Sequence, residues 1–279
     1  MVLMDGKKIK KEILEELKEE VNKLREKPNF VVIQVGNDKA SNTYINQKTK
    51  MAEYIGYKYT HLKYDESITE EELLNKITEL NMNNNIDGIM VQMPLPKHLN
   101  EYHIQNAISH EKDIDGLTDI NTGMLIHNQD SLYSCTPSGI MELLNRYNIS
   151  VKGMNAVVVG RSNLVGKPIA MMLTNADATV TLCHSKTNNL SEYTTKADII
   201  IVAVGKPKII TEDMVKPNAI VIDVGINLVD GKICGDVDFE NVSKKASYIT
   251  PVPGGVGQMT VAMLGQNVIK AYKKRRSKR

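Results

Sequence analysis

Residues 155–168 read NAVVVGRSNLVGKP, an apolar strand that runs into a glycine-containing loop and then into the start of a helix. A second apolar strand is predicted at 178–183, and two more follow at 197–204 and 219–224. Strands that alternate with helices in this way favour a parallel sheet with helical crossovers. The second half of the chain is therefore predicted to be a compact series of βαβ units.

The first half of the chain alternates in the same way. Helices are predicted from Ile9 to Leu24, from Ser41 (as N-cap) to Tyr54 and over 69–82, and strands over 29–35, 57–64 and 87–93. The predicted fold class is α/β with two domains and a cleft between them. An N-terminal α/β domain spans 1–140 and is completed by a C-terminal helix at 259–279, and a Rossmann-like dinucleotide-binding domain spans 141–258.

Composition narrows the class of protein. The chain is 42% hydrophobic and 24% charged, values that are typical of a soluble globular protein. No apolar run approaches a membrane span, and the N-terminus lacks the apolar core of a signal peptide. The three cysteines are widely spaced, which predicts reduced packing thiols in the cytoplasm and no metal site. The basic tail at 273–279 is interpreted as a frayed, solvated end, so no nucleic-acid or membrane partner is expected.

The loop at 160–168 lies where a Rossmann phosphate loop belongs, with Gly160 first and Ser162 at the middle position. A tight turn without a ligand is the alternative. The following strand ends in CHSK at 183–186, without the acidic residue that holds the ribose of NAD. Because Arg161 and Ser185 suit a 2′-phosphate, the sequence favours NADP over NAD. Ile226 follows a later strand, where a backbone loop is expected to face the nicotinamide.

A second candidate site combines four polar residues. Tyr44 and Lys48 share one face of a predicted helix, and Gln92 comes at the end of a buried strand, where ligands collect in open α/β sheets. Asp115 lies in a KDIDG turn, where its carboxylate can accept hydrogen bonds from a ring amidine. An ordinary surface lysine and a turn-forming aspartate are the alternatives.

The run PGGVGQMT at 253–260 lies between a strand-like stretch and a predicted helix. We interpret its glycines as positions where the backbone approaches a flat ligand closely. An ordinary strand-to-helix loop is the alternative.

Six motifs together resemble the methylenetetrahydrofolate dehydrogenase/methenyltetrahydrofolate cyclohydrolase (FolD) family, in order and in approximate spacing. They are SNTYINQKTK at 41–50, DGIMVQMPLP at 87–96, KDIDG at 112–116, GRSNLVGKP at 160–168, CHSKT at 183–187 and PGGVGQMT at 253–260. The resemblance spans nearly the whole chain. It implies oxidation of 5,10-methylenetetrahydrofolate with NADP, followed by hydrolysis to 10-formyltetrahydrofolate. It also suggests a homodimer.

The resemblance implies roles for individual residues. Lys48 would be the main cyclohydrolase residue, Tyr44 would pack on the substrate, Gln92 would position Lys48 and Asp115 would bind the pterin ring. The remaining implied contacts are with substrate (Val91, Met93, Pro253, Gly254, Gly255) and with NADP (Gly160, Arg161, Ser162, Ser185, Ile226). Hydrolysis requires proton transfer, so the pKa of Lys48 is predicted to lie below about 10.4.

One position departs from the family pattern, because Gln258 stands where the family often has proline. The alternatives are an enzyme that has kept only the dehydrogenase, a catalytically inactive folate- or nucleotide-binding protein, and a shikimate-type NADP-dependent dehydrogenase. Lys48, Gln92, Asp115 and Arg161 are all present, which favours the bifunctional enzyme.

Overall fold

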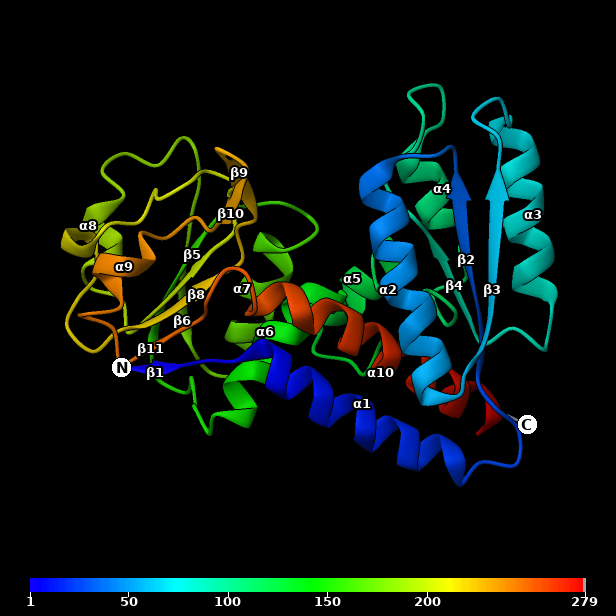
Figure 1. Cartoon of the computed structure of the whole chain (residues 1–279), viewed down its shortest axis with the longest axis horizontal. Helices are drawn as coiled ribbons and strands as arrows, with labels where there is room; N and C mark the ends of the chain where they lie inside the picture. Colours follow the sequence, from blue (N-terminus) through cyan, green and yellow to red (C-terminus); the bar gives the residue numbers. More distant parts are fainter. Residues whose placement is uncertain (278–279) are drawn as a thin grey trace. The chain divides into compact units, whose positions relative to one another are not determined.

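The computed structural model describes residues 1–277, and the chain folds into two compact units (Figure 1). The six-stranded unit comprises Met1–Lys11 and Thr136–Thr260, and the three-stranded unit comprises Glu12–Cys135 and the chain from Val261 onward. The sequence-based ranges placed residues 1–11 in the other domain. They belong to the six-stranded unit because strand β1 (Val2–Leu3) pairs with β11 (Tyr248–Ile249).

The six-stranded unit is built on a sheet in which every neighbouring pair is parallel, in the order β1-β11-β8-β7-β5-β6. Its inner strands are β8 (Ile220–Asp223), β7 (Ile199–Val202) and β5 (Asn155–Val159), and β6 (Thr179–Cys183) lies at one edge. Both β7 and β8 are buried along their whole length, as expected for strands covered on both faces.

The remaining elements of this unit are short. They are α6 (Cys135–Arg146), α7 (Gly166–Asn175), α8 (Ser191–Thr194), the 3-10 helix η1 (Glu212–Met214), α9 (Phe239–Val242) and the antiparallel hairpin β9 (Asn227–Val229) and β10 (Lys232–Cys234). The predicted strand–loop–helix at 155–168 is therefore present as β5, a loop and α7, which begins two residues earlier than predicted.

The three-stranded unit has a parallel sheet in the order β3 (Lys58–Tyr64), β2 (Asn29–Val35) and β4 (Gly88–Val91). Its helices are α2 (Lys39–Ile55), α3 (Glu70–Met82), α4 (Glu101–Ala107) and α5 (Asp119–Ile126), while α1 (Gly6–Asn22) and α10 (Val256–Arg276) contribute residues to both units. Alternate residues of β2 pack against α3 and α4 in one apolar core, whereas Gln34 faces the other way and hydrogen-bonds Asn42 of α2. The sheet therefore separates α2 from α3 (Figure 1).

Helix ends follow local chemistry. Helix α3 has a complete capping box, in which Thr69 and Glu72 exchange hydrogen bonds. Helix α2 begins two residues before the predicted Ser41. Its N-cap is Asp38, whose carboxylate accepts the Ser41 N–H at 2.7 Å. Gly56 ends α2 in the left-handed conformation at φ 88°.

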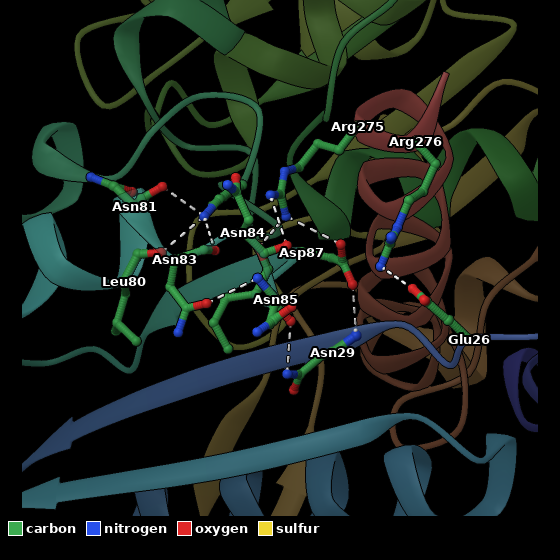
Figure 2. Close-up of polar contacts among 12 residues, drawn as sticks. Glu26, Asn29, Leu80, Asn81, Asn83, Asn84, Asn85, Asp87, Arg275 and Arg276 are labelled. Atoms are coloured by element: carbon green, nitrogen blue, oxygen red, sulfur yellow. Dashed lines mark hydrogen bonds and ion pairs between the residues drawn. The ribbon is translucent and has the colours of Figure 1, made fainter. Parts of the chain in front are cut away.

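The prediction of a frayed basic end is wrong for residues 273–276, which belong to α10 and are paired with acidic side chains. Arg275 reaches the buried Asp87 with an Nη1–Oδ1 distance of 3.1 Å and also hydrogen-bonds Ile86 O, and Arg276 pairs with Glu26 (Figure 2). Burial of Asp87 makes this contact structural, because an unpaired carboxylate there would be costly. Residues 278 and 279 lie outside the described residues.

No helix among residues 1–277 is long and apolar enough to cross a membrane.

Candidate active site

Three segments of the three-stranded unit bring Lys48, Gln92 and Asp115 together. Helix α2 carries Lys48 on its buried face, Gln92 follows β4 directly, and Asp115 lies in the turn after a short stretch that extends the sheet beside β4. That stretch is held by hydrogen bonds between Ile89 N and Lys112 O at 2.7 Å and between Ile114 N and Ile89 O at 3.3 Å.

Lys48 is only 6% exposed, and its Nζ donates a hydrogen bond to Gln92 Oε1 at 2.5 Å. The amide of Gln92 is fixed in turn, since its Nε2 donates to Met93 O at 2.6 Å. Burial lowers the pKa of Lys48, and the nearby Asp115 carboxylate partly opposes that change. The sequence-based expectation of a lowered Lys48 pKa agrees in direction with this environment.

Asp115 has little polar compensation for its burial. Desolvation raises its pKa from 3.8 to about 6, although Lys48 and a hydrogen bond with Cys135 act in the opposite direction. Burial lowers the pKa of the lysine and raises the pKa of the carboxylic acid, so a proton passes between two such groups at a smaller free-energy cost than between exposed ones. The arrangement therefore suits proton transfer to and from a bound substrate.

The turn that carries Asp115 is fixed by a second buried aspartate. The Asp113 carboxylate accepts hydrogen bonds from Gly116 N (3.0 Å) and Thr118 N (2.8 Å), and from the side-chain amides of Asn121 (3.0 Å) and Gln105 (3.3 Å). With these donors in place, Asp113 is a structural acid, and Asp115 remains available for a ligand.

Cys135 is a buried core residue, as predicted, and it is also part of this site. The thiol is 2% exposed, hydrogen-bonds with Asp115 and lies 3.5 Å from Ile114 O. Asn267 of α10 adds to the arrangement, because its Nδ2 donates to Ile114 O and Tyr133 O, each at 2.9 Å. Sequence reasoning missed Asn267 altogether, since nothing in its neighbourhood marks it.

The other predicted substrate residues occupy different environments. Tyr44 lies one turn before Lys48 on α2 and is 44% exposed. Val91 is buried at the end of β4, and Met93 is half-buried just beyond Gln92. Pro253, Gly254 and Gly255 belong to the six-stranded unit.

Two glycines of the 253–260 run, Gly254 and Gly255, are required by the local backbone, which was not predicted from the sequence. Gly254 has φ +114°, and a Cβ on Gly255 would lie 2.5 Å from Pro251 O. The first residue of α1 packs against the same backbone, because a Cβ on Gly6 would lie 2.1 Å from Gly255 O. The positive φ of Gly254 and the close approach of Pro251 O to Gly255 therefore explain these two glycines without a ligand.

The predicted phosphate loop joins β5 to α7. Gly160 has φ +126°, and a Cβ there would meet Ala203 O at 2.3 Å, while one on Gly166 would meet Gly160 O at 2.0 Å. Ser162 Oγ accepts hydrogen bonds from Val165 N and Gly166 N at the start of the helix. The loop can therefore have this shape only with glycine at both ends.

Exposed polar groups surround that loop. Arg161, Ser162 and Ser185 are exposed, and a hydrogen bond from Gly160 N to Cys183 O (2.9 Å) holds the ends of β5 and β6 side by side. Ile226 is 56% exposed after β8. A narrow glycine cradle, an exposed arginine and the absence of an acid at the end of β6 fit a phosphorylated dinucleotide.

Comparison with known proteins identifies the relatives of this chain. Residues 4–115 match the catalytic domain, and residues 134–276 the NAD(P)-binding domain, of the tetrahydrofolate dehydrogenase/cyclohydrolase family. The bifunctional protein FolD of a Nitratiruptor species is 54% identical over 99% of both chains.

Two solved structures agree with this result. The crystal structure of the bifunctional enzyme FolD from Campylobacter jejuni superposes with a TM-score of 0.97, is 49% identical and covers 99% of both chains. The enzyme from Trypanosoma brucei, solved with NADP cofactor and an inhibitor, has a TM-score of 0.92, is 36% identical and covers 98% of both chains.

Proposed function

The chain belongs to the tetrahydrofolate dehydrogenase/cyclohydrolase family, and from this premise we propose that it catalyses two successive folate reactions. It oxidises 5,10-methylenetetrahydrofolate to 5,10-methenyltetrahydrofolate with NADP, and it hydrolyses the product to 10-formyltetrahydrofolate. The observation that carries the proposal is the buried Lys48–Gln92 hydrogen bond beside Asp115, in a chain that matches both family domains nearly from end to end.

The oxidation needs a hydride acceptor, which NADP supplies when bound. Gly160 and Ser162 would lie against its phosphates, Arg161 and Ser185 would bind the 2′-phosphate, and Ile226 would face the nicotinamide. The protein's task in this step is to position the substrate, because the substrate's own nitrogen lone pairs stabilise the positive charge left by hydride loss.

The hydrolysis needs proton transfer at a carbon that carries positive charge. Water adds to the methenyl carbon and loses one proton, which gives a hydroxyl on that carbon. The hydroxyl loses its own proton to become the formyl C=O as the bond from that carbon to N5 breaks and N5 gains a proton, which leaves the formyl group on N10. We assign these proton transfers to Lys48, because burial lowers its pKa and so makes the amine easier to deprotonate than an exposed lysine. Gln92 holds Lys48 through its amide oxygen.

The remaining predicted contacts complete the proposal. Asp115 would accept hydrogen bonds from the pterin ring and Tyr44, exposed one turn from Lys48, would pack on it. Val91, Met93, Pro253, Gly254 and Gly255 stay predicted substrate contacts.

The alternatives are not favoured. A dehydrogenase without hydrolase activity has no need for the buried Lys48–Gln92 pair, and a shikimate-type activity does not agree with the folate-family match of both domains.

We also propose a homodimer in the cytoplasm. The β9–β10 hairpin exposes large apolar side chains, with Leu228 74% and Ile233 49% exposed, which suits a surface that a second copy covers. Reduced cysteines agree with a cytoplasmic location, since all three are free.

A coupled assay tests the function. Purified protein receives 5,10-methylenetetrahydrofolate with NADP or with NAD, and NADPH, methenyl and formyl products are followed separately. We expect NADP-dependent methenyl formation, followed by hydrolysis faster than the spontaneous reaction. Absence of NADP reduction would refute the dehydrogenase activity. Hydrolysis at the spontaneous rate would refute the cyclohydrolase activity and leave the dehydrogenase activity standing.

A further inference from the structure

Asp236 is completely buried in the six-stranded unit, and its carboxylate accepts four hydrogen bonds. Oδ2 accepts from Val204 N at 2.7 Å and Gly205 N at 2.9 Å, and Oδ1 accepts from Lys206 N and Asn227 Nδ2, each at 2.9 Å. All four donors are uncharged N–H groups; three come from the loop after β7, and the fourth comes from Asn227, the first residue of β9. A single side chain therefore joins the loop after β7 to the point where the loop after β8 ends.

A second buried aspartate holds Asp236 in place. Asp223, the last residue of β8, accepts hydrogen bonds from Asp236 N and Val237 N, each at 2.9 Å. The two acids pack against reciprocal glycines, because a Cβ on Gly225 would lie 2.2 Å from Asp236 Oδ1 and one on Gly235 would lie 1.9 Å from Asp223 Oδ2. The carboxylates thus occupy the space that side chains at those glycines would take.

Both loops held by Asp236 lead to the predicted NADP residues. The loop after β7 contacts the phosphate loop, since Ala203 O limits the space at Gly160 and Ala203 N donates to Val159 O at 2.8 Å. The loop after β8 carries Ile226, next to Asn227. The carboxyl ends of the parallel strands β5, β7 and β8 form one edge of the sheet, where dinucleotides bind in this fold class.

We propose that Asp236 is a positioning residue for NADP, which fixes the backbone on two sides of the cofactor site without touching the cofactor. This inference rests on the proposed NADP-dependent function. The chemistry requires an ionised carboxylate, because two oxygens must face four donors. An asparagine there would turn its NH2 group toward two N–H groups, whichever way the amide is oriented.

The test compares Asp236→Asn with Asp198→Asn. Asp198 is the control, because its carboxylate also accepts a backbone hydrogen bond, from Asn155 N at 2.8 Å, and pairs with Lys216. Asp198 lies at the amino ends of β5 and β7, whereas the proposed cofactor site lies at their carboxyl ends. We expect Asp236→Asn to raise the Kd for NADP, measured by calorimetry, and the KM for NADP by at least about tenfold. The KM for folate and the NADP-independent hydrolysis of supplied methenyltetrahydrofolate should stay within about twofold.

A second variant keeps the proposal falsifiable if Asp236→Asn folds poorly, and hydrogen exchange reports on the loop backbone if it folds. Asn227→Ala removes one of the four donors and should also raise the Kd for NADP, by a smaller factor than Asp236→Asn does. Hydrogen exchange at the Val204, Gly205 and Lys206 amides should be slow in the wild type and should accelerate in Asp236→Asn, but not in Asp198→Asn.

Unchanged NADP affinity in both Asp236→Asn and Asn227→Ala would overturn the inference, as would equal weakening by Asp198→Asn. Failure of the wild-type protein to bind NADP would instead refute the proposed function itself.

Discussion

Replacing Asp115 with asparagine should make the protein more stable and less active. In the folded chain the Asp115 pKa is raised from 3.8 to about 6 by burial. At about 1.4 kcal/mol per pKa unit, ionising it at neutral pH costs about 3 kcal/mol of folding free energy. The pKa of about 6 already includes the favourable interaction with Lys48, and because the side chain is partly accessible to solvent we expect a net gain of about 1–2 kcal/mol.

The pH dependence of this gain follows from the direction of the shift. The folded state holds the Asp115 proton more tightly than the unfolded state, so the penalty is absent below the unfolded pKa of 3.8 and grows as pH rises through the folded pKa of about 6. Urea unfolding at about pH 8 should show the full difference between variant and wild type, and at about pH 5 roughly half of it.

Asp113→Asn is the contrasting variant. In the wild type the Asp113 carboxylate accepts four hydrogen bonds, so replacing it with an amide should destabilise the protein by about 2 kcal/mol. A destabilised Asp115→Asn protein, or a stability gain that does not depend on pH, would show that the buried Asp115 charge does not lower the stability of the fold. Asp115→Asn is also expected to lose most folate turnover, since the stabilising change removes a proposed substrate contact.

Three other predictions concern named contacts. Arg161→Ala should raise the KM for NADP about tenfold or more and leave the KM for NAD nearly unchanged, as steady-state kinetics will show; equal effects on both cofactors would argue against a 2′-phosphate contact. Gly160→Ala, which would place a Cβ 2.3 Å from Ala203 O at φ +126°, should abolish NADP binding in calorimetry, and retained binding would contradict the cradle. Arg275→Met leaves Asp87 buried without its partner and should lower stability by about 3 kcal/mol in urea unfolding, whereas an unchanged midpoint would show that the pair is dispensable.

Much of the fold could be predicted from local sequence. The apolar runs at 29–35 and 155–159 coincide with β2 and β5, because a strand buried on both faces has a continuous apolar sequence. Helical spacing placed Tyr44 and Lys48 on one face, and the apolar run placed Gln92 after a strand, but the contact between Lys48 and Gln92 was implied only by the family resemblance.

The parts that could not be predicted depend on contacts between distant residues. Cys135 meets Asp115 only through folding, and Asn267 joins them from α10. The basic residues of α10 are paired because Asp87 and Glu26 lie near them in space, which charge patterning along the chain does not reveal. Glycine is required at 254 by a positive φ and at 255 by backbone packing, which a sequence motif cannot distinguish from ligand binding.

In the proposed mechanism Lys48 carries the hydrolysis, and the oxidation depends on Lys48 less. The most direct test is to measure both activities separately in Lys48→Ala, with Lys50→Ala, an exposed lysine of the same helix, as the control. We predict that methenyl hydrolysis falls by about 10²-fold or more while NADPH formation partly survives, and that Lys50→Ala retains both. Equal loss of the two activities in Lys48→Ala, or hydrolysis that persists, would contradict the assignment of the hydrolysis to Lys48.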